Sequence, residues 1–340
     1  MILLTMVNSK DINAGSKAQN DIKTILENKY KGLIESRMIY FDKEEKQKNN
    51  LFIKVKNTIH KIFLLRKANR KDDYKIIQYP ISSQVWLMNF IKKENTIVFI
   101  HDLIGLRSRN RKIINKEMKM LEDMAVIVAH NEKMRDFLIA EGLDPKKIYS
   151  LELFDYLIDD GKIKKRSPEL IVDYAGNLKR IKAPFIYELN EDKMGFILNL
   201  YGNGLEEIGN SKIKAKGTFP SEQLPFNLSG NLGLIWDGEL DDSDGDEGFK
   251  NYGKYINPHK LSCYISAELP VIVWEKAGYA KFVVDNGIGY TINNLYEIND
   301  IDLTTYNEKV NNIKKLKKKI IEGNYTETVF NKIIKDINKN

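Results

Sequence analysis

Short, continuous runs of apolar residues, rich in valine and isoleucine, recur along this chain of 340 residues. Continuous rather than alternating apolarity predicts strands that are covered on both faces, and therefore a parallel sheet. Segments with helical spacing lie between the runs, at 83–93, 111–124 and 132–142, which is typical of a doubly wound α/β domain. The runs of the first half are MILLTMV (1–7), YKIIQYP (74–80), TIVFIHD (96–102), AVIVAHN (125–131) and KIYSLELF (147–154).

The same alternation resumes in the second half of the chain. Around 155–168 the sequence reads DYLIDDGKIKKRSP, a polar and charged stretch that we interpret as an interdomain linker. We therefore expect two Rossmann-like domains, 1–160 and 169–303, with a ligand-binding cleft between their strand ends. The runs of the second half are 169–176, 195–202, 212–219, 232–238, 270–276 and 289–292, with helices expected at 183–189, 258–268 and 278–286.

The segment 304–340 is lysine-rich and has apolar residues at helical spacing, from Val310 to Ile321. It has a face to bury, so we expect a C-terminal helical tail that packs back on the body of the protein. The alternative is attraction of its lysines to an anionic membrane surface.

Charge and cysteine content limit the class of protein. The net charge is +7, but only nine of the 54 cationic residues are arginine, the residue that best reads phosphate and guanine. We therefore expect a generally basic surface and no nucleic-acid partner. Cys263 alone cannot form an intramolecular disulfide, and no signal peptide or spanning apolar segment is evident. A soluble, cytoplasmic protein is the expectation.

The common ligand-binding motifs are incomplete or absent in this sequence. GNGLEE (202–207) lacks the third glycine of a dinucleotide fingerprint, and no phosphate-binding G-x-x-x-x-G-K-[ST] occurs. The acidic loop ELDDSDGDEG (239–248) departs from a calcium loop at its required glycine and its final glutamate. It is interpreted either as a lid or as a solvated loop. The four histidines show no metal-ligand spacing with Cys263.

The strongest local signal is YINPHKLSCYISAELPVIVW (255–274). Asn257 as N-cap and Pro258 as first residue predict a helix whose opening turn carries His259 and Lys260. Such a turn attracts anions, and a pyrophosphate fits it well. Ser262 could donate one more hydrogen bond. An ordinary capped helix with a surface lysine is an equally good interpretation of these residues alone.

Other candidate residues follow the ends of predicted strands. In the second half these are Asn177 and Lys179 after the strand at 169–176, and Tyr201, Gly202, Gly217 and Thr218 after the next two. In the first half, His101 and Asp102 end a central strand, where either could act as a general base, and one of the pair could instead be structural. Ser16 lies after the first strand, next to a helix N-terminus.

These segments together resemble the bacterial glycosyltransferase family that includes the glucosyltransferase 3 of serine-rich adhesin glycosylation. The resemblance rests on AGNLKR, LYGNG, KGTF, LPFNLSGNLGLIWDG and YGKYINPHKLSCYISAELPVIVWEKAGYAKFV, and on FIHDLIGLR, VIVAHNEKM and LELFDYL in the first half. It covers most of the chain and is most specific from Trp236 to Trp274. Homologues in this family are often labelled β-1,6-galactofuranosyltransferases.

The resemblance implies a GT-B fold, in which two Rossmann-like domains face a cleft and the C-terminal domain holds a UDP-sugar. It also implies metal-independent binding without a further cofactor, and a homo-oligomer, either dimer or tetramer. Carried over by motif, Lys260 would face the diphosphate and Ser16 would approach the donor from the first domain. The other implied UDP contacts are Asn177, Lys179, Tyr201, Thr218, Asn257 and Ser262, with Gly202, Gly217 and His259 beside them.

The expected function is transfer of a hexose from a UDP-sugar, of the UDP-glucose or UDP-galactose type, to a sugar hydroxyl on a glycoprotein or lipid-linked glycan. Two alternatives stay open. One is a non-catalytic GT-B subunit that stabilises a partner transferase, and the other is a polyanion-binding protein.

Overall fold

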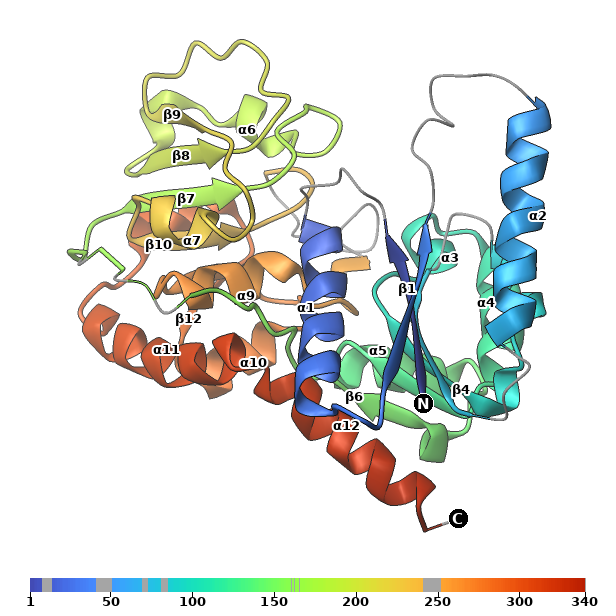
Figure 1. Cartoon of the computed structure of the whole chain (residues 1–340). Helices are drawn as coiled ribbons and strands as arrows, with labels where there is room; N and C mark the ends of the chain where they lie inside the picture. The colour runs from blue at the N-terminus through green and yellow to red at the C-terminus, as the bar shows by residue number, and fades with distance from the viewer. Residues whose placement is uncertain are drawn as a thin grey trace. The chain divides into compact units, whose positions relative to one another are not determined.

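The computed structural model describes residues 1–7, 14–40, 51–68, 73–80, 85–159, 161, 163, 164, 166–240 and 252–339. It divides into two compact units (Figure 1), each described here by itself. The first comprises Met1–Glu152 together with Tyr325–Asn340, and the second comprises Leu153–Asn324. The expected linker at 155–168 thus falls within the second unit, and the expected tail at 304–340 is shared between the two units.

The first unit is built on a sheet of six parallel strands in the order β2-β1-β3-β4-β5-β6. Five of them coincide with the predicted apolar runs, and every residue of β3, β4 and β5 is buried. The sixth, β2, is an edge strand, and it was missed because its sequence, ESRMIY, begins with three polar residues and so lacks a continuous apolar run. The strands are β1 (Ile2–Val7), β2 (Glu35–Tyr40), β3 (Lys75–Tyr79), β4 (Thr96–Ile100), β5 (Val126–Ala129) and β6 (Ile148–Ser150).

Helices connect these strands. A helix expected at 83–93 is a shorter 3-10 helix, Val85–Phe90, whereas those expected at 111–124 and 132–142 are present. Asn110 and Asn131 begin the latter two, each accepting a hydrogen bond from the backbone N–H three residues on. The helices of this part of the chain are α1 (Ala14–Lys29), α2 (Leu51–Ala68), η2 (Val85–Phe90), η3 (Lys93–Asn95), α3 (Ile104–Arg107), α4 (Arg111–Glu122), α5 (Glu132–Ala140) and η4 (Pro145–Lys147).

The last helix, α12 (Asn324–Ile337), returns to the first unit and lies against α1. Lys29 pairs with Glu327 at 2.5 Å, and Tyr30 donates to Asn331 at 2.8 Å. The apolar side of the helix, including Phe330 and Ile333, is fully buried. This part of the tail therefore buries its apolar face against the first unit.

Two histidines, the buried His130 and the half-buried His101, give the first unit a specific acid sensitivity. Burial lowers the pKa of His101 to about 4, and burial together with the nearby His101 lowers the pKa of His130 to about 3. Both values lie below the 6.5 of an unfolded histidine, so the unfolded state binds protons first as the pH falls. The stabilisation is complete above pH 6.5 and is lost progressively toward pH 4.

We expect the free energy of unfolding of the first unit to fall by about 2–4 kcal/mol between pH 7 and pH 5. The substitution His130→Phe removes one titrating group while keeping an aromatic ring in a site that is 3% exposed. Denaturant unfolding at a series of pH values should therefore give a shallower slope for the variant. Equal slopes for the two proteins would contradict the assignment.

The second unit has the same architecture. Its six parallel strands lie in the order β12-β11-β10-β7-β8-β9, and all six were predicted. The three helices expected at 183–189, 258–268 and 278–286 are also present, although shorter. The elements are β7 (Ile171–Ala175), α6 (Phe185–Glu188), η5 (Glu191–Lys193), β8 (Ile197–Tyr201), β9 (Ile213–Gly217), α7 (Leu224–Asn227), β10 (Leu232–Ile235), α9 (His259–Ser266), β11 (Val271–Trp274), α10 (Ala280–Asp285), β12 (Gly289–Ile292), η6 (Leu295–Asp300) and α11 (Tyr306–Ile321).

Helix α11 completes the second unit by packing on α9. Lys317 donates to Glu268, just beyond the end of α9, at 3.0 Å, and the Tyr306 hydroxyl donates to the Asn231 carbonyl at 3.1 Å. The residues Ile313 and Ile320 are fully buried. Within the described residues, no helix combines the length and the apolarity that crossing a membrane requires.

The strand order locates the most favourable place for a ligand in the second unit. The chain runs outward from β7 through β8 to β9, then returns across β7 to form β10 on its other side. In open α/β sheets, ligands bind at the carboxyl ends of the strands where the order reverses in this way. That point lies between the ends of β7 and β10, and α9 follows β10 in the chain.

Candidate functional site

Lys260 lies at the carboxyl edge of the second sheet, where the strand order reverses. Its Nζ is 3.1 Å from the Tyr174 hydroxyl and 3.4 Å from Asp237 Oδ1, and it stands 4.2 Å from the centre of the Tyr174 ring. Tyr174 belongs to β7 and Asp237 follows β10, so three separate elements meet around one ammonium group. The side chain of Lys260 is 19% exposed.

This environment keeps Lys260 charged. Burial alone would lower the pKa of the ammonium, but the Asp237 carboxylate and the Tyr174 hydroxyl outweigh it and hold the pKa above its ordinary value. The same residue occupies the first turn of α9, where the positive end of the helix dipole adds positive potential. A fixed positive charge at a helix N-terminus favours a phosphate or diphosphate ligand.

Glycines at the strand ends allow the chain to come close to Lys260. A Cβ on Gly176 would lie 3.2 Å from Lys260 Nζ and 3.4 Å from the Tyr174 hydroxyl. Gly202 has a φ of +147°, and a Cβ there would lie 1.8 Å from the Gly176 carbonyl oxygen. The ends of β7 and β8 can therefore meet only with glycine at position 202.

We expect Gly202→Ala to separate the two strand ends, to lower the free energy of unfolding by about 2–4 kcal/mol and to weaken nucleotide binding. Gly209→Ala is the matched control, because a Cβ at that position meets no atom within 4 Å. Denaturant unfolding and nucleotide titration of both variants check this. Equal behaviour of the two variants would contradict the close approach.

Backbone and side-chain hydrogen bonds connect the remaining predicted residues along the carboxyl edge of the second sheet. Gly202 N donates to Gly217 O at 2.9 Å, and Thr218 Oγ1 donates to Asn203 Oδ1 at 2.7 Å. Asn177 Oδ1 accepts from Lys179 N at 3.1 Å, and Lys179 packs beside Gly204. Except for Gly202, which is half-buried, the predicted residues of these loops, Asn177, Lys179, Gly217 and Thr218, are exposed. The structure thus brings them together along the ends of β7, β8 and β9.

Two predicted contacts point into the protein instead. Ser262 is fully buried, and its hydroxyl donates to the Phe154 carbonyl. Tyr201 is 3% exposed, and its hydroxyl lies 2.9 Å from both the Oγ and the backbone N of Ser229. Both side chains therefore stabilise the strand ends through internal hydrogen bonds, and their contact with a ligand stays a prediction.

The start of α9 also differs from the prediction by one residue. Pro258 is the N-cap, with φ −73° and ψ 140°, and the helix begins at His259. Asn257, the predicted N-cap, lies one position earlier and is 3% exposed. The His259 ring contacts the Tyr156 ring, with centres 4.8 Å apart, so it is packed against the segment that enters the second unit.

In the first unit, His101 and Asp102 follow β4 at the carboxyl edge of its sheet. Asp102 forms an ion pair with Arg107, and His101 Nε2 lies 2.7 Å from Gln78 Oε1. Gln78 Nε2 donates to the Gln19 carbonyl, which fixes the direction of the amide. His101 Nε2 must then carry the proton, and Nδ1 is the basic nitrogen of the ring. Ser16 lies in the first turn of α1 and is half-buried.

A buried carboxylate supports this segment. Glu117, on α4, is fully buried and accepts hydrogen bonds from the Tyr79 hydroxyl and from the backbone N–H groups of Ile104 and Gly105. Burial raises its pKa, and the nearby Asp102 adds to the effect. Glu117 thereby holds the start of α3, and with it the loop that carries Asp102.

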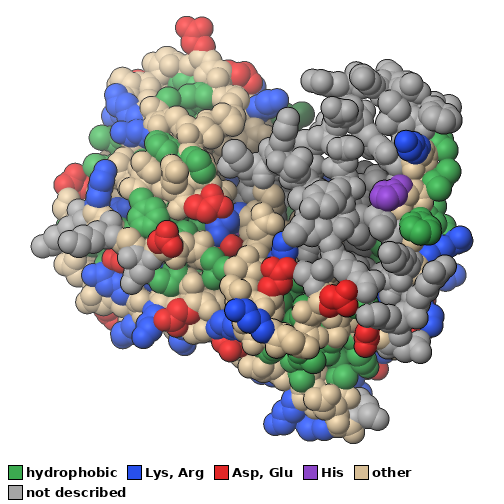
Figure 2. All heavy atoms as spheres, in the orientation of Figure 1, with side chains coloured by type: hydrophobic (Ala, Val, Ile, Leu, Met, Phe, Trp, Pro, Cys, Tyr) green, Lys and Arg blue, Asp and Glu red, His purple; other side chains and the backbone are tan. Residues whose placement is uncertain are grey.

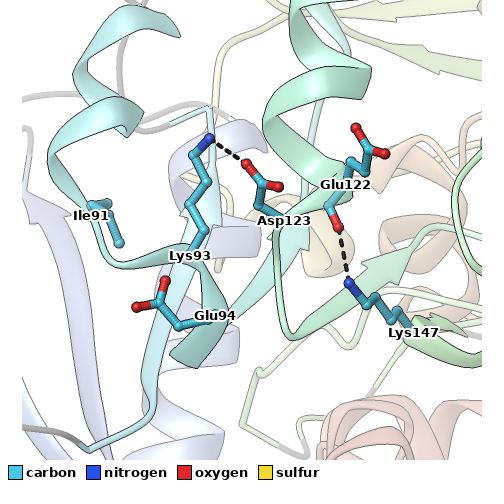
Figure 3. Close-up of a pocket in the computed structure, with 6 residues that line it drawn as sticks. All are labelled: Ile91, Lys93, Glu94, Glu122, Asp123 and Lys147. Atoms are coloured by element: carbon cyan, nitrogen blue, oxygen red, sulfur yellow. Dashed lines mark hydrogen bonds and ion pairs between the residues drawn. The ribbon is translucent and has the colours of Figure 1, made fainter.

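A hollow of about 510 Å³ lies on the opposite edge of the first sheet (Figure 3). It is formed by the segments that precede β4, β5 and β6. Both of its lysines already have a partner. Lys93 pairs with Asp123 at 3.0 Å, and Lys147 donates to the Glu122 carbonyl at 3.0 Å. Because both of its lysines have a partner and it lies at the amino edge of the strands, the hollow is not a candidate active site.

Sequence reasoning missed Tyr174 and Asp237, the two residues that hold Lys260. Asp237 stands in the turn after β10 and carries no local signature of a site, since its partner lies 23 residues further along the chain. The strand order could have found it, because the end of β10 adjoins the reversal point. Within the described residues no three or more histidine, cysteine, aspartate or glutamate side chains gather as metal ligands. The acidic loop from 241 onward lies outside them.

Comparison with known families agrees with this layout. The model of the glucosyltransferase 3-like N-terminal domain matches residues 1–153, and that of the C-terminal domain matches residues 172–333. The β-1,6-galactofuranosyltransferase WbbI of Escherichia coli (strain K12) is 33% identical over 282 residues, which cover 78% of this chain and 80% of that protein.

Solved structures show the same GT-B architecture. The chain is similar to the lipopolysaccharide outer core galactosyltransferase WaaB, with a TM-score of 0.60 and 14% identity over 98% of this chain and 100% of that one. It is also similar to Anabaena Alr3699/HepE in complex with UDP-glucose, with a TM-score of 0.58 and 12% identity over 98% and 100% of the two chains. The two parallel α/β units therefore form a GT-B fold, as the sequence predicted.

Proposed function

Because the chain belongs to the glucosyltransferase 3-like family, we propose that it is a glycosyltransferase that takes a hexose from a UDP-sugar and transfers it to a sugar hydroxyl. The relatives are named as transferases of glucose and of galactofuranose, and a structural neighbour binds UDP-glucose. These names support the reaction class. The identity of the hexose depends on the shape of the pocket around its hydroxyl groups.

One observation carries the proposal. The Lys260 ammonium stands in the first turn of α9, between Tyr174 and Asp237, directly beside the glycine end of β7. A diphosphate that lies against Gly176 would meet this ammonium and the positive end of the α9 dipole. The exposed loops that end β8 and β9, with Asn177, Lys179 and Thr218 close by, would hold the rest of the nucleotide.

This arrangement explains how the leaving group departs. When the bond between the hexose and the β-phosphate breaks, negative charge grows on the phosphate oxygen. A positive charge that is already in place stabilises that oxygen without reorganisation. Asp237 holds the lysine in the absence of ligand, and its carboxylate would repel an arriving diphosphate, so the ammonium exchanges one anionic partner for another.

The acceptor hydroxyl loses a proton when it attacks. For an inverting transfer we propose that Asp102 or His101 takes this proton, with Gln78 and Arg107 as positioning residues. Their side chains hold the two groups through the contacts described above. The acceptor is a sugar on a glycoprotein or a lipid-linked glycan.

The remaining features of the proposal concern the setting of the reaction. We propose that UDP is bound without a metal ion, that the enzyme is a homo-oligomer and that it works in the cytoplasm, where UDP-sugars would be its donors. A chelator such as EDTA should then leave the rate of UDP release unchanged.

The test is thermal unfolding with UDP, GDP and UDP-sugars, followed by measurement of UDP release. A ligand that binds only the folded state raises the melting temperature. We expect UDP and one UDP-hexose to raise it more than GDP does, and that UDP-hexose to release UDP without a partner protein. Release only with a partner would support a non-catalytic subunit. Affinity for any polyanion that falls steeply as the salt concentration rises, with no competition by UDP, would support a polyanion-binding protein.

A further inference from the structure

Helix α2 of the first unit carries an apolar stripe that remains exposed. Val55, Ile59 and Phe63 lie one turn apart on one face of the helix, and they are 48%, 61% and 57% exposed. Figure 2 shows hydrophobic and cationic side chains together along the right-hand edge, where Figure 1 places α2. Three large apolar residues in a row on an exposed helix face indicate a surface that binds a partner or a membrane.

The stripe is not needed to attach the helix to its own unit. Leu65, which is 1% exposed, packs inward from a different side of α2. The Arg66 guanidinium lies 5.2 Å from the centre of the Phe90 ring in η2, which holds the C-terminal end of the helix. The helix thus has its own anchor, and the stripe faces outward.

The charge of the helix selects the partner. The sequence from Leu51 to Ala68, LFIKVKNTIHKIFLLRKA, contains five lysines and arginines and no aspartate or glutamate. Lys56 and His60, beside the stripe, are exposed. Two copies of this helix packed face to face would bring like charges together, whereas an anionic lipid surface offers both apolar depth and negative charge.

We propose that α2 docks the first unit on the surface of an anionic phospholipid bilayer. The side chains of Val55, Ile59 and Phe63 enter the boundary between headgroups and acyl chains, and the exposed Lys56 lies among the lipid phosphates. The helix lies in the plane of the membrane and does not cross it. This surface is independent of the nucleotide site, so the proposal stands or falls without the proposed transferase activity.

The test is co-sedimentation of the full chain with vesicles of phosphatidylcholine alone and of phosphatidylcholine with phosphatidylglycerol. We expect binding to the anionic vesicles, weakened when the salt rises from about 0.1 M to about 1 M, because salt screens the lysines. The double substitution Ile59→Ser with Phe63→Ser should lower the partition coefficient about tenfold or more. Val284→Ser is the matched control, since Val284 is 59% exposed on α10 of the second unit, and it should bind as the wild type does.

Four results would overturn the proposal: no vesicle binding, equal binding to neutral and anionic vesicles, binding that survives the double substitution, or an oligomer that this substitution dissolves while vesicle binding is absent. The last result would make the stripe an interface between copies of the chain. Because the replaced side chains are exposed, the melting temperature of the double variant should equal that of the wild type, which separates loss of docking from loss of fold.

Discussion

Lys260→Ala is expected to lower the turnover of the UDP-sugar by about 10²- to 10³-fold, which is the usual effect of removing one preorganised charge from a developing anion. It should also weaken UDP binding, because the diphosphate loses its closest cation. The measurement is UDP release at saturating donor, together with a titration of UDP. Near-normal UDP affinity in the variant would contradict the role of Lys260.

A further variant separates charge from packing at this position, and a second serves as its control. Lys260→Met keeps a long side chain beside Gly176 and the Tyr174 ring but removes the ammonium, so it should be as defective as the alanine variant. Lys281→Ala removes a lysine of α10 that is 81% exposed, and should leave both readouts unchanged. Full activity of the methionine variant would show that the side chain matters only for packing.

Replacement of the base is the second large effect. For an inverting transfer, His101→Ala or Asp102→Asn should lower turnover by about 10²- to 10⁴-fold, while UDP binding, which belongs to the other unit, stays unchanged. UDP release in the presence of acceptor, with UDP titration as control, measures both quantities. Full turnover by both variants would contradict a base at this strand end.

The pH dependence tests the environment of His101. Burial lowers the pKa of His101 to about 4, so its imidazole is already the unprotonated base at all higher pH values. If His101 is the base, initial rates should stay level down to about pH 5 and fall as the pH passes through 4. An acidic limb near pH 6.5, the ordinary value for histidine, would contradict the buried environment of this residue.

The fold was predictable wherever a strand is covered on both faces. Runs such as TIVFIHD and PVIVWEK are continuous and apolar because helices cover both sides of a parallel sheet. β2 escaped prediction because its sequence, ESRMIY, begins with three polar residues and so lacks a continuous apolar run. The first sheet therefore has one more strand than the sequence indicated.

The site was predictable only where its residues follow strand ends or helix starts. Lys260 was predicted because Asn257 and Pro258 mark the start of α9 in the sequence. The burial of Ser262 was not predictable, because every residue of α9 from Leu261 to Ser266 is buried and the sequence of this helix shows no alternation of exposed and buried faces. Asp237 and Tyr174 contact Lys260 only because the strand order brings the ends of β7 and β10 beside α9. A pattern along the sequence does not contain the strand order.

Hydrogen–deuterium exchange of the wild-type protein with and without UDP tests the central claim most directly, since it locates the nucleotide without any substitution. Binding should protect backbone amides at the carboxyl edge of the second sheet: 176–180, 202–205, 217–219 and the first turn of α9. Protection confined to the first unit, or none at saturating UDP, would contradict a UDP-sugar site around Lys260.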